Sequence, residues 1–163
     1  QTAVPYVSHL LTVCALVLED GGDEDEAIAA LLHDAVEDQG GAETLATIRD
    51  RFGDRVADIV DGCSDTDQVP KPPWRQRKEA YLAHLADPAT TPSVLRVSAA
   101  DKLHNARSVA ADRRHAGEAV WDRFNAGRDE QLCYSRSLVD VLQRRLPGRL
   151  TDQLADAVEA LDA

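Results

Sequence analysis

The feature that most restricts the fold of this chain is the spacing of its apolar residues, which recur every three or four positions along almost all of its 163 residues. That period places apolar side chains on one face of an α-helix, whereas a strand would need strict alternation, and no convincing alternation is present. Aromatic residues make up only 4% of the chain, while Ala, Leu and Val dominate, which also favours packed helices. The sequence therefore predicts an all-α fold.

Glycine, proline and capping residues divide this pattern into separate helices. Ser8 and Asp23 are expected to start the first two helices. The glycine pairs at 21–22 and 40–41, Gly53 and the Pro147-Gly148 step are expected to end or break helices, and the proline-rich stretch 64–74 is the clearest loop. The predicted helices cover about 8–20, 23–38, 42–52, 54–63, 75–86 and 93–113, followed by two or three helices between 117 and 162.

Length and composition indicate one globular domain spanning residues 1–163. Hydrophobic residues make up 44% of the chain and charged residues 29%, enough for a real core and too apolar for disorder. No apolar run approaches the roughly 20 residues that a membrane-spanning helix needs, and no signal peptide opens the chain. The chain begins at Gln1 and contains no Met, which leaves open whether further residues precede it.

The net charge and the cysteine content exclude several classes of partner and of cysteine site. The net charge of −11 would repel DNA or RNA, so we expect neither a nucleic-acid nor a membrane partner, although a small anion could bind with help from a metal or local basic residues. Cys14, Cys63 and Cys133 are odd in number and far apart, which argues against a disulfide framework or a zinc ribbon. Buried reduced thiols in the cytoplasm are the expectation.

The segment "IAALLHDAVED" (28–38) carries the strongest chemical signal. Its apolar start runs directly into His33, Asp34, Glu37 and Asp38. On a continuous helix, residues four apart share a face, so His33 would lie beside Glu37 and Asp34 beside Asp38. Carboxylates so close to a buried segment cost several kcal/mol unless they are paired, and one divalent cation could pair with several of them. The simpler alternative is a helix end that turns polar as it leaves the core.

Two other segments place similar groups among apolar residues. His9 lies in an apolar first helix, where alone it would be an ordinary core histidine, and Asp101 follows an apolar stretch in "VLRVSAADKLHNARS". Asn105 and Ser108 continue the polar stripe that begins at Asp101. One shared metal ion would explain all three segments together.

The order of these segments resembles a known superfamily. "PYVSHL", "AALLHDAVED", "FGDRVADIVDGC", "RKEAYLAHL" and "ADKLHNARS" resemble the HD-domain metal-dependent phosphohydrolases, and most closely the RelA/SpoT-type alarmone hydrolase domain with its stand-alone small alarmone hydrolases. These core motifs cover residues 5–108, and the C-terminal helices at 109–163 resemble the family only loosely. The resemblance implies a helical bundle of about eight to ten helices and one divalent metal, usually Mn²⁺, with Fe²⁺ or Zn²⁺ as alternatives.

The resemblance also implies roles for individual residues. The metal ligands would be His9, His33, Asp34 and Asp101, and either Glu37 or Asp38 would orient or deprotonate the attacking water. The nucleotide contacts would come from a further set of residues: Asn105, Lys102, Lys78, Arg77, Ser108, Tyr6, Arg128 and Tyr134. For each lysine or arginine, a solvated surface charge is the alternative, and for Tyr6 stacking and packing remain equally open.

The implied activity is metal-dependent removal of the 3′-pyrophosphate from guanosine tetra- or pentaphosphate or from related adenosine alarmones. The family's basic pair ahead of the "PY" segment is not matched after Gln1, which leaves the preference between guanine and adenine open. Other nucleotides, such as nucleoside monophosphates or NADPH, are the alternative substrates. A nucleotide-sensing domain without turnover and a purely structural helical protein are the alternatives outside catalysis, and the oligomeric state is not predicted.

Overall fold

The computed structural model describes residues 4–66 and 70–162, and for Asp38 it describes the backbone alone. The helices are α1 (Val7–Glu19), α2 (Glu24–Leu32), α3 (Ala35–Gln39), α4 (Gly41–Phe52), α5 (Asp54–Cys63), α6 (Trp74–Ala86), α7 (Pro92–Ala116), the 3₁₀ helix η1 (Gly117–Arg123), α8 (Arg128–Arg145) and α9 (Arg149–Asp162). Within these residues there are nine α-helices, one 3₁₀ helix and no strand. This confirms the all-α class and the expected number of helices.

The long helix α7 is the centre of the fold. Thr91 caps its first turn by accepting a hydrogen bond from the Val94 backbone N–H, and Pro92 occupies the first helical position, where a backbone donor is not needed. The helix continues to Ala116, three residues beyond its predicted end, and Gly117 ends it at a φ of +61°. At 25 residues it is about 37 Å long.

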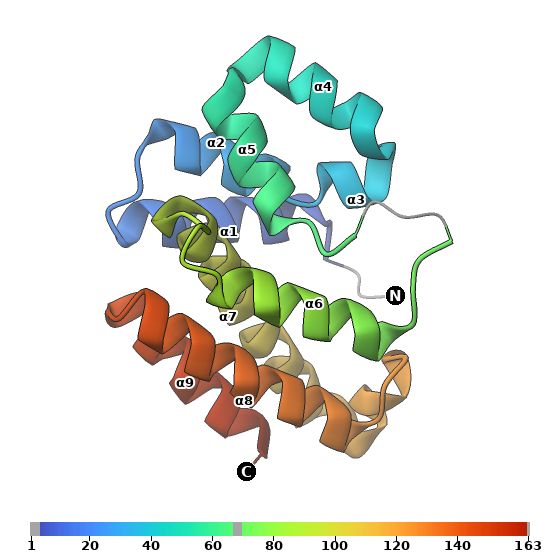
Figure 1. The fold of residues 1–163 in the computed structure, drawn as a ribbon. Helices are drawn as coiled ribbons and strands as arrows, with labels where there is room; N and C mark the ends of the chain where they lie inside the picture. The colour runs from blue at the N-terminus through green and yellow to red at the C-terminus, as the bar shows by residue number, and fades with distance from the viewer. Residues whose placement is uncertain (1–3, 67–69, 163) are drawn as a thin grey trace.

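Six of the other helices pack on α7 (Figure 1). Helices α1, α2 and α5 contact its first half, while η1, α8 and α9 contact its second half. Its buried apolar side chains join a single cluster that includes residues from α1 to α9: Val94, Leu95, Val97, Ala99, Ala100, Leu103 and Ala106. Asp101 is buried among them. The core thus holds a charged side chain at a fixed position near the middle of the molecule.

A buried ion pair fixes α2 against α7. Glu26 is only 3% exposed, and its Oε1 accepts a hydrogen bond of 2.5 Å from the Arg96 guanidinium. The same Glu26 completes a capping box with Asp23, which starts α2 as expected from the sequence. Arg96 also pairs with Asp20 at the end of α1, at 3.0 Å. These contacts tie the start of α2 to α7 and to the end of α1.

Two local predictions were wrong. Ser8 does not cap α1, because the helix begins one residue earlier with Tyr6 at the capping position and no side-chain cap. The predicted helix from 23 to 38 is two helices, α2 and α3, separated at His33 and Asp34. The His33 side chain bonds to the Ala30 carbonyl, and such side-chain contacts compete with the helical ladder. The fourth helix, at 54–63, and the break at Pro147-Gly148 were predicted correctly.

No helix in the described part of the chain combines the length and the apolar character that crossing a membrane requires. The three cysteines are free thiols, as expected, but the expectation that they are buried was wrong, because Cys133 is exposed and Cys14 and Cys63 are only partly buried.

Candidate metal centre and adjoining cavity

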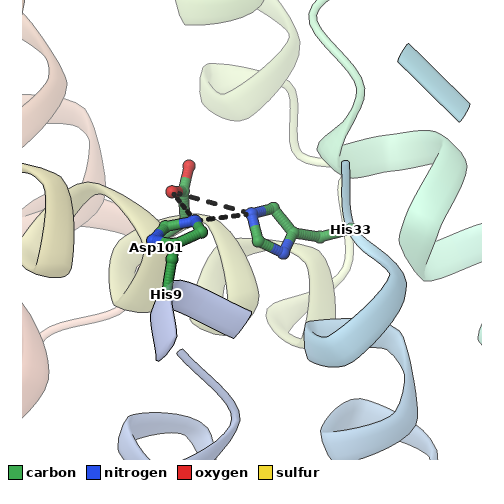
Figure 2. A group of neighbouring side chains, drawn as sticks. All are labelled: His9, His33 and Asp101. Atoms are coloured by element: carbon green, nitrogen blue, oxygen red, sulfur yellow. Dashed lines mark hydrogen bonds and ion pairs between the residues drawn. The ribbon is translucent and has the colours of Figure 1, made fainter. Parts of the chain in front are cut away.

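Three side chains from three separate helices meet at one point. His9 comes from α1, His33 from the end of α2 and Asp101 from α7, and their ligand atoms all lie within 4.8 Å of one another. Figure 2 shows the two imidazole rings and the carboxylate turned toward each other. The distance from His9 Nε2 to Asp101 Oδ1 is 3.4 Å, and that from His33 Nε2 to the same oxygen is 3.6 Å. The two Nε2 atoms are 3.4 Å apart.

Asp34 lies at the edge of this group. Its Oδ2 is 3.3 Å from His33 Nε2 and 3.9 Å from His9 Nε2. The Tyr6 hydroxyl donates a hydrogen bond to the same oxygen. The break between α2 and α3 allows the side chains of the consecutive residues His33 and Asp34 to point toward the same group of ligand atoms.

The donor atoms of this group fit a divalent cation. His33 Nδ1 is 2.8 Å from the Ala30 carbonyl oxygen, which can only accept, so in the neutral ring Nδ1 carries the proton and Nε2 presents a lone pair. That lone pair faces carboxylate oxygens, which are also acceptors, so the group needs either a proton or a cation between its members. Metal–ligand bonds of about 2.0–2.2 Å bring neighbouring ligand atoms to about 3–3.5 Å, close to the separations seen here.

Asp101 is held in its ionised form by its neighbours. Its Oδ2 accepts from Lys102 Nζ at 2.6 Å, and its Oδ1 accepts from Asn105 Nδ2 at 2.7 Å. Burial alone would raise the pKa of this carboxyl, but Lys102 and the hydrogen bonds from His33 and His9 outweigh it and hold the pKa well below its usual value. Asp101 therefore keeps an anionic oxygen directed at the two histidines.

Burial opposes a charge on His33 as well. Hydrogen bonding to Asp101 and the charges of Asp101 and Asp34 outweigh that effect, so the pKa of His33 is raised. A cation at this point would take the place of that proton, because a metal-bound imidazole must present a lone pair.

A cavity of about 470 Å³ adjoins this group on the C-terminal half of α7. Five of the predicted nucleotide contacts line it: Lys78, Lys102, Asn105, Ser108 and Tyr134. Its wall also includes Trp74, Trp121 and Phe124. One helix, α7, thus provides both Asp101 to the candidate metal centre and polar side chains to the cavity, and Lys102 and Asn105 of the cavity wall bond Asp101.

Two polar atoms in the cavity wall lack a hydrogen-bond partner. These are Trp121 Nε1 and the Tyr134 hydroxyl, both buried and both without a partner among the described residues. Burial raises the pKa of Tyr134 to about 12, so its hydroxyl keeps its proton at neutral pH and can act as a donor. Buried donors without partners are costly, and a bound acceptor-rich ligand would satisfy them.

The remaining predicted site residues lie outside the lining of this cavity. Glu37 is on α3, where its Oε1 accepts from Lys71 Nζ at 2.7 Å. Arg77 pairs with Asp65, which also accepts from Lys78 at 2.8 Å. Arg128 is paired with the carboxylates of Glu118 and Asp162. The side chain of Asp38 lies outside the part of the chain that the structure describes.

Two residues of the site were missed in the sequence. His104 Nδ1 is 2.7 Å from His9 Nδ1, and its position three residues after Asp101 on a helix could have placed it on the same face. Burial and the nearby His9 lower the pKa of His104, which favours its neutral form. Trp121 carries no comparable signal, because it reaches the cavity only through the fold of η1 against α7.

Comparison with known proteins agrees with this geometry. Residues 1–131 match a family model described as HD domain. The chain belongs to the HD domain family. Its members share a helical fold with a divalent metal centre, and the group formed by His9, His33 and Asp101 suits such a centre.

Relatives of the chain include proteins named for guanosine nucleotides. The chain is 38% identical over 105 residues, 64% of its length, to a probable GTP pyrophosphokinase of Mycobacterium leprae, and covers 13% of that protein. It is 36% identical over 107 residues to a guanosine-3′,5′-bis(diphosphate) 3′-pyrophosphohydrolase, MESH1, of Xenopus tropicalis, covering 64% of this chain and 56% of that one. The chain therefore spans only part of the length of these relatives, about one-eighth in the first case.

Two solved structures have a similar fold. The crystal structure of lmo0812 from Listeria monocytogenes matches with a TM-score of 0.80 at 30% identity, over 93% of this chain and 96% of that one. A metazoan ortholog of SpoT, reported to hydrolyse ppGpp, matches with a TM-score of 0.73 at 23% identity, over 96% and 81% of the two chains. At that identity, the second match supports the fold alone.

Proposed function

We propose that this protein is a Mn²⁺-dependent hydrolase that removes the 3′-pyrophosphate from guanosine tetra- or pentaphosphate or from the corresponding adenosine alarmones. The observation that carries the proposal is the position of the cavity, which begins at Lys102 and Asn105, the two residues that bond Asp101. The names of the relatives support the substrate class.

The cation would be held by His9 Nε2, His33 Nε2, Asp101 Oδ1 and Asp34 Oδ2. Two imidazoles with two carboxylates suit Mn²⁺, Fe²⁺ or Zn²⁺ better than Mg²⁺, which prefers oxygen ligands. When bound, the cation supplies a Lewis acid that activates water at neutral pH and offsets charge on the phosphoryl group.

The side chains of this protein supply the remaining steps. Glu37 takes the proton from the attacking water or holds that water in line. Water attacks the phosphorus joined to the 3′ oxygen and that P–O bond breaks, which releases pyrophosphate. The 3′ oxygen takes up a proton from solvent, and the nucleotide leaves with a 3′ hydroxyl and its 5′ phosphates intact. Lys78 and Lys102, on the cavity wall, neutralise the phosphates. The Trp121 indole N–H and the Tyr134 hydroxyl donate to acceptors of the nucleotide.

A substrate panel with Mn²⁺-loaded protein tests the proposal. Guanosine and adenosine tetraphosphates are compared with guanosine 3′-diphosphate, nucleoside monophosphates and NADPH. We expect pyrophosphate from both tetraphosphates at similar kcat/KM and a weaker reaction when the 5′ phosphates are missing. Rapid turnover of monophosphates with release of free phosphate, and none of either tetraphosphate, would contradict it.

A pair of variants adds a test of the cavity. Lys78→Gln removes a partly buried positive charge from the cavity wall and should lower kcat/KM for the tetraphosphates about tenfold or more, the usual value of a charged hydrogen bond. Arg144→Gln removes an exposed charge from α8, outside the cavity lining, and should leave kcat/KM unchanged. If the two substitutions change kcat/KM equally, the substrate phosphates do not bind at the cavity wall beside Lys78.

A further inference from the structure

The two histidines of the candidate metal centre are held in different ways. The imidazole of His33 is fixed from behind by the backbone, since its Nδ1 lies 2.8 Å from the Ala30 carbonyl oxygen. The corresponding nitrogen of His9 meets a side chain instead, because His9 Nδ1 lies 2.7 Å from His104 Nδ1. His9 therefore depends on the hydrogen-bonding state of another imidazole.

Only one direction of the His9–His104 hydrogen bond is compatible with a bound cation. Between two ring nitrogens, one must donate and the other accept. If His9 Nδ1 accepts, then the proton of the neutral ring is on Nε2, where it points at Asp101 Oδ1 3.4 Å away and leaves no lone pair for a metal. If His9 Nδ1 donates, Nε2 is free to coordinate, and His104 must accept through an unprotonated Nδ1.

The position of His104 in the fold suits this task. It lies one helical turn after Asp101 on α7, so the same helix presents a metal ligand and the acceptor for a second ligand. The rings of His9 and His104 have centroids 4.8 Å apart at an angle of 49°, which leaves the His9 ring held between α1 and α7. A small rotation of the His9 ring would turn its Nε2 away from His33 Nε2, 3.4 Å away.

We propose that His104 is a positioning residue that accepts the Nδ1 proton of His9, and so fixes the tautomer and orientation in which His9 Nε2 faces Asp101 and His33. Partners of metal-binding histidines typically change metal affinity by about 10–100-fold when they are removed. The inference concerns metal affinity and not the substrate, so it can be tested even if no alarmone is hydrolysed.

The test is the affinity of the protein for Mn²⁺ alone, measured by electron paramagnetic resonance titration. His104→Phe keeps an aromatic ring but removes the acceptor, and should weaken Mn²⁺ binding about 10–100-fold. His104→Asn offers an amide oxygen near the place of Nδ1 and should restore most of the affinity. His115→Phe, which changes an exposed histidine on the same helix, is the matched control and should bind Mn²⁺ like the unmodified protein.

Wild-type affinity in His104→Phe would overturn the proposal, as would equal weakness in His104→Phe and His104→Asn, which would indicate packing alone. If His104→Phe does not fold, a measurement on the unmodified protein can still test the proposal. In its Zn²⁺-loaded form, ¹⁵N spectra of the imidazoles should show a proton on His9 Nδ1 and none on His104 Nδ1. The reverse pattern would contradict the proposal.

Discussion

Asp101 is a buried carboxylate whose two oxygens have different partners. Lys102 binds Oδ2, while Oδ1 faces the histidines and accepts from Asn105. A buried charge without partners would cost several kcal/mol, and these contacts offset much of that cost. The division leaves Oδ1 available to a cation while Lys102 connects the same carboxylate to the cavity.

Glu37 should behave differently from the metal ligands. Glu37→Gln keeps the shape of the side chain but removes the base, so kcat should fall by about 10²–10⁴-fold while Mn²⁺ binding and KM stay near their original values. Steady-state kinetics with metal analysis checks this. Glu43→Gln, at an exposed position of α4, is the control. Unchanged kcat in Glu37→Gln would assign proton transfer to another group.

The sequence identified site residues only where a polar side chain interrupted an apolar stretch. His9, His33 and Asp101 each interrupt an apolar stretch, and the structure brings them within 4.8 Å of one another. His104 and Trp121 interrupt nothing. Their contribution depends on which neighbours the fold provides, and a single sequence does not specify these neighbours.

At the scale of helices, the sequence predicted most positions but not the break at His33-Asp34. The apolar pattern of α2 continues into α3 through Val36, which is buried, so the spacing alone favours one helix. At the break, His33 turns inward toward His9 of α1 and Asp101 of α7, while its Nδ1 bonds to the Ala30 carbonyl three residues earlier. A helix propensity argument cannot detect such a contact.

Close packing between α5 and α7 depends on Gly62. A Cβ at this position would lie 2.6 Å from Val94 Cγ2 and 3.1 Å from its Cγ1, and the β-branched Val94 side chain is buried. Overpacking costs about 1–3 kcal/mol, against about 1 kcal/mol gained from replacing a helical glycine, so Gly62→Ala should destabilise the protein by up to about 2 kcal/mol. Urea unfolding measures the change.

Repeating the Gly62→Ala substitution in a second background provides a control. In a Val94→Ala background the space is available, so Gly62→Ala should become stabilising because only the helix propensity remains. Gly148→Ala adds a Cβ where nothing lies within 4 Å and should show no such reversal. If Gly62→Ala stabilises both backgrounds equally, the close approach of the two helices is not present in solution.

For the whole molecule, the candidate metal centre joins the first two helices to α7, about 70 residues further along the chain. Because the side chains of this candidate centre come from α1, the end of α2 and α7, a cation bound there should stabilise the complete fold. At a free Mn²⁺ concentration of 100 times Kd the gain is about 2.7 kcal/mol. For a domain of this size, that corresponds to a rise in Tm of roughly 5–10 °C.

Differential scanning calorimetry with and without Mn²⁺ checks this expectation. Asp101→Asn should abolish the rise in Tm, whereas Asp156→Asn, at an exposed position on α9, should keep it. Equal melting of metal-free and Mn²⁺-loaded wild-type protein would argue against a buried metal centre.

The most direct test of the proposed reaction follows the oxygen of the attacking water. Hydrolysis of guanosine tetraphosphate by the Mn²⁺-loaded protein in H₂¹⁸O should place one ¹⁸O atom in the released pyrophosphate and none in the guanosine diphosphate, because water attacks the phosphorus next to the 3′ oxygen. Mass spectrometry of both products gives the answer. Label in the nucleotide, or labelled free phosphate beside a nucleotide that keeps one 3′ phosphate, would contradict the account.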